Sequence, residues 1–154
     1  MKITFDTYKP EYSADFERLN IAWLKQYFYV EKHDEEVLSK PEKYIIQTGG
    51  HILVALADNQ VVGVVALMKT EDGDYELTKM AVDKTVRGQK IGQQLMKYCL
   101  EYAKNEKIDS LILYSNRRLE NAIYIYHKFG FVEVPLEDNL PYERADIKMK
   151  LTIK

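Results

Sequence analysis

The segment from Val82 to Tyr98, VDKTVRGQKIGQQLMKY, joins the end of an apolar stretch to the start of a long amphipathic one. A helix that begins just after a strand directs its free backbone N–H groups and the positive end of its dipole beyond the strand end. Gly88 and Gly92 allow the backbone to approach a ligand closely, and Arg87 and Lys90 add positive charge. The pattern predicts a phosphate or pyrophosphate site, although two glycines near a helix start also serve simply to relieve crowding.

Two common phosphate-binding motifs do not fit this segment. A P-loop requires Lys followed by Ser or Thr after its second glycine, whereas Gln93 and Gln94 follow Gly92. A Rossmann site requires a G-x-G-x-x-G pattern after a strand of a βαβ unit, and the sequence contains none. The spacing therefore argues against both of these nucleotide-binding classes.

A second segment downstream, LENAIYIYHKFGF, supplies the context for the first. Together, ELTKMAVDKTVRGQKIG and NAIYIYHKFGF resemble the GCN5-related N-acetyltransferases (GNAT family). In that family the first segment binds the pyrophosphate of acetyl-CoA and the second carries a tyrosine near its sulfur. The resemblance covers most of the chain, most specifically Glu76 to Phe131. It implies one N-acetyltransferase domain over residues 1–154, with acetyl-CoA as co-substrate and an amine as acceptor.

The phosphate motif of that family is Gln or Arg, two residues, Gly, one residue, then Gly or Ala. Arg87 matches its first position and Gly92 its last, but Lys90 stands where glycine is usual. A residue in the first helical turn needs ordinary helical angles, so we expect Lys90 to be tolerated with its side chain directed away from the ligand. The cofactor-binding residues that the resemblance implies in this loop are Arg87, Gly88, Gln89, Lys90, Ile91 and Gly92.

The strand before this loop has a separate role in the family, where its backbone binds the pantetheine arm of the cofactor. The corresponding residues here are Met80, Ala81 and Val82. A backbone N–H group in this strand would also polarise the thioester carbonyl and stabilise the developing oxyanion. We expect the side chains of these three residues to lie mostly in the core.

Tyr126 lies where the family places its general acid. Its phenol, with an unperturbed pKa of about 10, would protonate the departing CoA thiolate. With 12 tyrosines in the chain a structural role is the common alternative, and Tyr124 is a competing candidate. The family often has an asparagine seven residues earlier, where this chain has Leu119. Asn121 is therefore our candidate for that cofactor contact and Asn116 its alternative, although either also suits the cap of an element.

The resemblance implies direct attack of the amine on the thioester while both substrates are bound. An amine with a pKa of ~10.4 is neutral in only about one molecule per few thousand at pH 7, a penalty of roughly 4–5 kcal/mol. Glu76, six residues before Val82, matches the catalytic glutamate of the histone-acetyltransferase branch. A salt-bridged strand carboxylate, with a water chain as the base, is the alternative. Cys99 is a poor candidate nucleophile because its spacing places it on a buried helix stripe.

The segments expected to select the acceptor, EKHDEEVLSK and PLEDNLPYER, are rich in carboxylates. Carboxylates near the acceptor cleft would favour a cationic amine, whereas the alternative is an ordinary charged surface. A non-catalytic acyl-CoA-binding sensor or interaction module is the alternative to an enzyme. The carboxylates are Glu31, Asp34, Glu35, Glu36, Glu137, Asp138 and Glu143.

The amino-acid composition restricts the partners, the location and the metal content that we expect for this protein. The chain has 154 residues, 46% of them hydrophobic, and 22 basic and 24 acidic side chains give a formal charge of −2. We therefore expect no nucleic-acid partner. A lone Cys99 suits a cytoplasmic location, and the absence of a signal peptide or long apolar run predicts no membrane partner. A homodimer is an open alternative to a monomer. His33, His51 and His127 lack metal-ligand spacing, so no metal is expected.

The hydrophobic periodicity predicts an α/β (α+β) domain, a mixed and mostly antiparallel sheet with helices on both faces, in the order β-α-α-β-β-β-α-β-α-β-β. The strand segments are residues 2–8, three strands within 49–82 joined by turns at 58–59 and 72–74, 109–114, 131–134 and 142–154. The helical segments are a helix opened by Pro10 and continuing through Phe28, then residues 34–39, a long helix from Gly88, and residues 119–129 closed by Gly130.

Overall fold

The computed structural model describes residues 2–70, 73–86, 89–140 and 143–153. The strands within these residues are β1 (Ile3–Thr7), β2 (His51–Ala57), β3 (Gln60–Lys69), β4 (Tyr75–Val82), β5 (Ser110–Ser115), β6 (Val132–Val134) and β7 (Ile147–Thr152). They form one sheet in the order β1-β2-β3-β4-β5-β7-β6. Every neighbouring pair is antiparallel except β4 and β5, which are parallel. The predicted mixed, mostly antiparallel sheet is confirmed.

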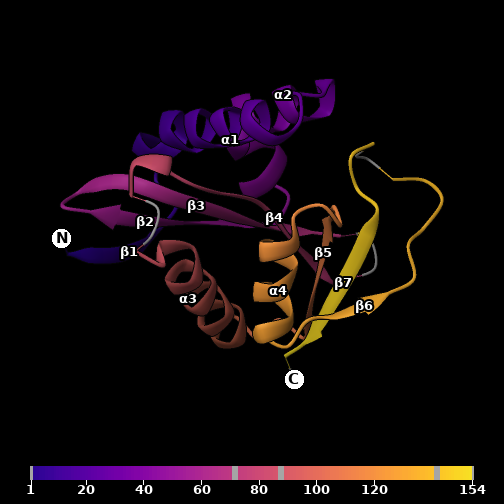
Figure 1. Ribbon diagram of the computed structural model, residues 1–154. Helices are drawn as coiled ribbons and strands as arrows, with labels where there is room; N and C mark the ends of the chain where they lie inside the picture. Colours follow the sequence, from indigo (N-terminus) through magenta and orange to yellow (C-terminus); the bar gives the residue numbers. More distant parts are fainter. Residues whose placement is uncertain (1, 71–72, 87–88, 141–142, 154) are drawn as a thin grey trace.

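Helices cover both faces of this sheet (Figure 1). The helices are α1 (Ser13–Tyr27), α2 (Lys32–Ser39), α3 (Ile91–Asn105) and α4 (Glu120–Lys128), with short helical turns η1 (Pro10–Tyr12), η2 (Glu42–Ile46) and η3 (Lys84–Val86). Figure 1 shows α1 and α2 on one face and α3 and α4 on the other. Each face has its own core: Phe16 and Leu38 are fully buried under the first pair, and Leu95 is fully buried under the second.

Two turns expected from the sequence form as predicted. Asp58 and Asn59 connect β2 to β3 with φ values of 49° and 70°, the left-handed conformations that a tight two-residue hairpin requires. Gly130 follows α4 with a φ of 100°, which ends the helix without the steric cost that a side chain would incur. These local signals therefore locate the β2–β3 hairpin and the end of α4 correctly.

Strands β4 and β5 separate soon after they begin to pair. Among the described residues they are in register only at Tyr75–Leu111 and Glu76–Ile112. The β3–β4 register also shifts, because Ala66 pairs with Thr78 but Val64 pairs with Ala81. Two residues of β4 thus oppose one of β3, which is a β-bulge, and Lys79 within it has a φ of 56°. The sheet consequently opens between β4 and β5.

The boundaries of three elements differ clearly from prediction, and two short helical turns were missed. Helix α2 begins at Lys32 instead of residue 34, because the Asp34 carboxylate reaches back to accept a hydrogen bond from the Glu31 N–H at 3.0 Å. Helix α3 begins at Ile91, and the Gly88 expected to start it lies outside the described residues. Strand β7 begins only at Ile147, because residues 143–146 form a turn segment around Arg144. The short turns η2 and η3 were not predicted from the sequence.

Candidate active site

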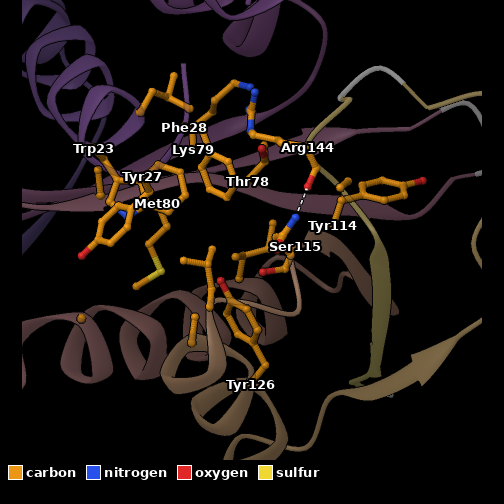
Figure 2. A pocket seen from close by; sticks show the side chains of 18 of the residues that line it. Trp23, Tyr27, Phe28, Thr78, Lys79, Met80, Tyr114, Ser115, Tyr126 and Arg144 are labelled. Carbon is orange, nitrogen blue, oxygen red and sulfur yellow. Dashed lines mark hydrogen bonds between the residues drawn. The ribbon is translucent and has the colours of Figure 1, made fainter. Parts of the chain in front are cut away.

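A cavity of about 610 Å³ occupies the opening between β4 and β5. Residues from both faces line it, so it connects the α1–α2 side of the sheet with the α3–α4 side. In Figure 2, Tyr126 lies on one side of this space, and Lys79 and Arg144 lie on the opposite side. Several predicted site residues line the cavity together: Met80, Ala81, Val82, Gly92, Asn121 and Tyr126.

Gly92 lies on the α3–α4 side of the cavity, in the first turn of α3. Among the described residues, a Cβ atom added at this position would meet only the Val82 Cγ2 at 3.7 Å, which is an ordinary van der Waals contact. None of these residues therefore demands glycine here, although glycine costs about 1 kcal/mol relative to alanine inside a helix. The open space beyond the Gly92 Cα at a helix N-terminus is a cradle for an anionic group approaching from the cavity.

Lys90 corrects one expectation about this loop. It is the N-cap of α3 with φ and ψ of 58° and 29°, a left-handed conformation instead of the ordinary helical angles that we predicted. The left-handed region favours glycine and costs an L-residue roughly 1–2 kcal/mol. This explains why the related motif has glycine at the position. Lys90 and Gln89 are exposed and Ile91 is buried in the core, whereas Arg87 and Gly88 lie outside the described residues.

The backbone of β4 faces the opening along the predicted stretch. Met80, Ala81 and Val82 all line the cavity, and β5 leaves the β4 edge before it reaches them. Backbone N–H and C=O groups on such an edge are available to an extended, amide-containing ligand. Of the three side chains, only Ala81 is fully buried. The bulge at Lys79 was not predicted, and it directs this stretch toward the cavity.

Tyr126 reaches the cavity from α4 (Figure 2), where its hydroxyl points into the open space. Its ring packs edge-on against Phe131, with the ring centroids 6.0 Å apart, which holds the side chain in place. Burial raises the pKa of the Tyr126 phenol to about 12. The competing candidate, Tyr124, is 67% exposed and is not among the residues that line the cavity.

The two candidate asparagines occupy different positions. Asn121 is an exposed residue that lines the cavity at the start of α4. Asn116 also lines the cavity, and it connects two chain segments, because its Nδ2 donates to the Arg144 carbonyl at 2.7 Å and its Oδ1 accepts from the Arg118 N–H at 3.0 Å. Asn116 thereby links the end of β5 to the segment that carries Arg144.

A cluster of charged side chains forms the α1–α2 side of the cavity, and we call Glu31, Asp34, Lys79 and Arg144 the ion cluster. Asp34 is fully buried at its centre. Arg144 donates to both Asp34 carboxylate oxygens at 2.9 Å and to Glu31 Oε2 at 2.7 Å. The Lys79 Nζ lies 3.5 Å from Asp34 Oδ1. The cluster joins α2, the β4 bulge and the segment before β7.

Burial and pairing act against each other within the ion cluster. Burial would raise the pKa of Asp34, but hydrogen bonds from Arg144 and the Glu31 N–H, together with the charge of Lys79, lower it overall. For Lys79 burial prevails, and its pKa is lowered despite the nearby carboxylates of Asp34 and Glu76. Asp34 is thus a stably ionised carboxylate committed to two cations, which makes it a poor general base.

The two other residues considered for chemistry lie outside the cavity lining. Glu76 is on β4 next to Leu77, which belongs to the core on the α3–α4 side, so Glu76 faces the α1–α2 side. It is partly buried and acts electrostatically on Lys79. Cys99 is fully buried in α3, and burial raises the pKa of its thiol to about 12. A thiol in that state is a poor nucleophile at neutral pH.

Most carboxylates of the two acidic segments are engaged or exposed away from the cavity. Glu137 accepts hydrogen bonds from Tyr114 at 2.5 Å and forms an ion pair with Lys148 at 3.1 Å. Glu143 accepts from Tyr29 at 2.6 Å. Of the seven carboxylates, Asp34 alone is among the described residues that line the cavity. This arrangement favours the alternative of an ordinary charged surface over steering of a cationic amine.

An aromatic wall made of Trp23, Tyr27 and Phe28 adjoins the ion cluster (Figure 2). The Trp23 ring centroid lies 5.3 Å from that of Tyr27 and 5.7 Å from that of Phe28. The Arg118 guanidinium carbon lies 4.2 Å from the centroid of the Phe28 ring, and its Nη2 donates to the Tyr27 carbonyl. The α1–α2 side of the cavity therefore combines an apolar surface with cations.

Comparison with known proteins identifies the family. The family model described as the acetyltransferase (GNAT) domain matches residues 48–133, which is more than half of the chain. The chain belongs to the GNAT acetyltransferase family. The matched residues include β4, α3 and α4, the elements that form the α3–α4 side of the cavity.

Curated relatives of this GNAT protein are distant. N-acetyltransferase family 8 member 2 of Rattus norvegicus is 27% identical over 116 residues, which cover 72% of this chain and 51% of that protein. N-acetylaspartate synthetase of Xenopus tropicalis is 34% identical over 92 residues, covering 59% of this chain and 34% of that protein. The chain spans about half the length of the first relative and a third of the second.

Solved structures share the GNAT fold over nearly the whole chain. A GNAT-family acetyltransferase of Staphylococcus aureus Mu50 superposes with a TM-score of 0.86 at 23% identity, covering 99% of this chain and 100% of that one. The PaiA N-acetyltransferase of Thermoplasma acidophilum, solved in complex with coenzyme A, has a TM-score of 0.75 at 19% identity, and 99% of each chain is covered. At these identities the likeness shows the fold.

The motifs of this GNAT chain did not reveal the three cations on the cavity wall, Lys79, Arg118 and Arg144. The signal for Lys79 was a charged residue in an otherwise apolar strand, ELTKMAV, where only a bulge and a buried carboxylate make lysine tolerable. Arg144 lies in a segment whose alternation we assigned to a strand, so nothing marked its side chain as buried. Within the described residues, no group of three or more His, Cys, Asp and Glu side chains is suited to a metal ion, and no helix is long and apolar enough to span a membrane.

Proposed function

We propose that this protein transfers the acetyl group of acetyl-CoA to the amine of an acceptor by direct attack within a ternary complex. The observation that carries the proposal is the single cavity that passes through the sheet between β4 and β5. It has a helix N-terminus with an unobstructed glycine on one side and a phenol directed into it. Family membership supports the same assignment.

The cofactor fits the α3–α4 side of the cavity. The pyrophosphate is assigned to the α3 N-terminus at Gly92, with Gln89 and Lys90 nearby, and Arg87 and Gly88 complete the predicted loop. The pantetheine arm is assigned to the β4 edge from Met80 to Val82, with Asn121 as a further contact. An N–H group on this edge would hold the oxyanion when the amine attacks. When bound, acetyl-CoA supplies the activated acetyl group.

The role of Tyr126 follows from its pKa. Because burial raises the pKa of the Tyr126 phenol to about 12, above the ~8.5 of an ordinary thiol, complete proton transfer from the phenol to the thiolate is unfavourable. Tyr126 is therefore assigned as a hydrogen-bond donor that stabilises the leaving thiolate. The proton that finally neutralises the sulfur comes from the acetylated nitrogen by way of solvent, so protons balance without any net change at Tyr126.

The amine must lose a proton before it attacks, and Glu76 remains our candidate base. It faces the α1–α2 side of β4 without lining the cavity, so a water molecule would have to relay the proton. Asp34 is excluded from this role because both of its oxygens accept hydrogen bonds from Arg144. A cytoplasmic location, a homodimer and the lack of nucleic-acid and membrane partners stay predictions from the sequence.

The test is thiol release from acetyl-CoA in the presence of a panel of amines: a polyamine, an amino sugar, a lysine peptide and several amino acids. We expect amine-dependent turnover with at least one acceptor. Tight binding of acetyl-CoA, measured by calorimetry, without turnover on any amine would instead support the non-catalytic acyl-CoA-binding module.

A further inference from the structure

The α1–α2 side of the cavity indicates the chemical class of the acceptor. We infer that the acceptor carries a carboxylate and an apolar group beside its amine, as an aromatic or branched amino acid does. This inference rests on the proposed function, because it concerns the second substrate of the same site. The charges on the cavity wall and the aromatic wall beside them carry it.

The wall presents more positive than negative charge to the cavity. Lys79, Arg118 and Arg144 line the α1–α2 side, and they come from three separate segments of the chain. Two carboxylates are among the described lining residues: Asp34, which is completely buried and shared between Lys79 and Arg144, and Glu120, an exposed residue at the start of α4. Glu31 accepts a hydrogen bond from Arg144 but does not line the cavity.

This balance of charge favours an anion over a second cation. The side chain of Lys79 is only 4% exposed, so its charge is poorly solvated and gains from any anionic group that enters the cavity beside it. The planar guanidinium of Arg144 is held in a fixed orientation by three hydrogen bonds to carboxylates. A carboxylate on the acceptor would meet both charges, whereas a polyamine would add a cation to a wall that already has three.

The apolar part of the acceptor is assigned to the aromatic wall. Trp23, Tyr27 and Phe28 are partly buried and lie on the same side of the cavity as Lys79 (Figure 2). Rings in such a wall pack favourably against an aromatic or branched side chain, and they leave a strongly hydrated acceptor without polar partners. The ion cluster and the aromatic wall therefore match the two ends of an apolar amino acid, and its amine lies between them.

The first experiment measures kcat/KM for four acceptors at saturating acetyl-CoA: L-phenylalanine, L-phenylalaninamide, L-aspartate and spermidine. Phenylalanine and its amide differ only in the carboxylate. Loss of the carboxylate also lowers the pKa of the amine, so intrinsic reactivity alone would favour the amide. We expect phenylalanine to exceed its amide by about 10- to 100-fold, the range for one charge-assisted hydrogen bond. Aspartate should be a weaker acceptor than phenylalanine, and spermidine the weakest.

The second experiment repeats the phenylalanine and amide measurements with Lys79→Met and with Arg117→Met. Lys79→Met should bring the ratio of the two kcat/KM values close to one, mainly by raising KM for the acid. Arg117 is an exposed arginine paired with Glu133 away from the cavity, so its variant should keep the wild-type ratio.

The outcomes separate the two proposals. Equal or better turnover of the amide or of spermidine would overturn the inference and leave the proposed acetyl transfer intact. Turnover of no amine would overturn the proposed function and the inference together. Because the wild-type comparison decides the matter alone, the result does not depend on whether Lys79→Met folds.

Discussion

The two sides of the cavity are built in different ways. On the α3–α4 side, Gly92 and Tyr126 lie within two short motifs, and the ligand is met largely by backbone groups, a helix terminus and one phenol. On the α1–α2 side, Asp34 and Arg144 are 110 residues apart and meet through charged side chains. The first construction suits a cofactor shared by a whole family. The second depends on individual side chains, which is why we assign the choice of acceptor to it.

The largest expected effect concerns the cofactor side. Tyr126→Phe should lower kcat about 100-fold or more, because it removes the only hydrogen that the side chain offers to the thiolate, while the Kd for acetyl-CoA stays within about twofold. Steady-state kinetics and calorimetry measure the two quantities. Tyr124→Phe, on the same helix but exposed, is the matched control and should behave like the wild type. Full activity in Tyr126→Phe would exclude this residue from the chemistry.

The pH dependence of kcat/KM in the wild-type protein tests the same role of Tyr126. Because the pKa of Tyr126 is raised to about 12, its phenol stays protonated across the neutral and mildly alkaline range. The acceptor amine, by contrast, loses its proton as the pH rises. We expect kcat/KM to increase between pH 7 and pH 9, with no descending limb caused by Tyr126. A fall in rate over this range would show that Tyr126 loses its proton below pH 9 or that another group must stay protonated for the reaction.

On the acceptor side, Arg144→Met should be the most damaging change to stability. It leaves the buried Asp34 carboxylate with the Lys79 ammonium and the Glu31 N–H but without its two hydrogen bonds from Arg144, and breaking a buried pair in this way costs about 3–5 kcal/mol. Urea unfolding at pH 7 measures the free energy. Arg117→Met breaks an exposed pair with Glu133 and should cost no more than about 1 kcal/mol. Equal losses of unfolding free energy in the two variants would show that the ion cluster stabilises the fold no more than an exposed ion pair does.

The lowered pKa of Asp34 determines how the free energy of unfolding changes as the pH falls. Its pKa is lowered in the folded protein, so the unfolded chain binds its proton more readily. The stability that this group contributes is therefore present above its unfolded pKa of about 3.9 and is lost as the pH falls through its lower folded value. In Arg144→Met the folded pKa should rise, so the loss attributable to Asp34 should begin at a higher pH.

A smaller effect should separate binding from stability on the cofactor side. Gly92→Ala replaces the least favourable ordinary helix residue, so the protein should gain about 0.5–1 kcal/mol. The motif accepts Ala as well as Gly at this position, so the Kd for acetyl-CoA should stay within about threefold in Gly92→Ala. Gly92→Asp instead places a negative charge and bulk at the proposed pyrophosphate, and its Kd should rise roughly 10- to 100-fold. Lys97→Ala on the exposed face of α3 is the control and should leave the Kd unchanged. Unchanged affinity in Gly92→Asp would remove the pyrophosphate from this position.

The smallest expected effect comes from the two left-handed lysines at the ends of α3. Lys90 and Lys107 have φ values of 58° and 60°, and both are exposed. Replacement of either by glycine should stabilise the protein by about 1 kcal/mol. Only Lys90→Gly removes a charge beside the proposed pyrophosphate, so it alone should change the affinity for acetyl-CoA, by a few-fold. Equal affinities in both variants would show that the Lys90 charge does not act on the cofactor.

The same contrast between the two sides explains which features of the fold and of the site could be predicted from the sequence. The order of elements, the α3 N-terminus, the β4 backbone and Tyr126 follow from periodicity and short motifs, because local interactions determine them. The bulge at Lys79 depends on how β3 and β4 align, and the left-handed angle at Lys90 depends on the path of the loop into α3. The pairing of Asp34 with Arg144 requires the tertiary fold, because no spacing rule connects residues so far apart.

The central claim is that the acetyl group passes directly from acetyl-CoA to the amine across the open sheet. Initial-velocity kinetics over a grid of both substrate concentrations, with an acceptor found in the panel, tests it most directly. A ternary complex predicts intersecting lines in double-reciprocal plots, and no acetylated protein by mass spectrometry when the amine is omitted. Parallel lines together with an acetylated chain would show an acyl-enzyme intermediate and contradict the account.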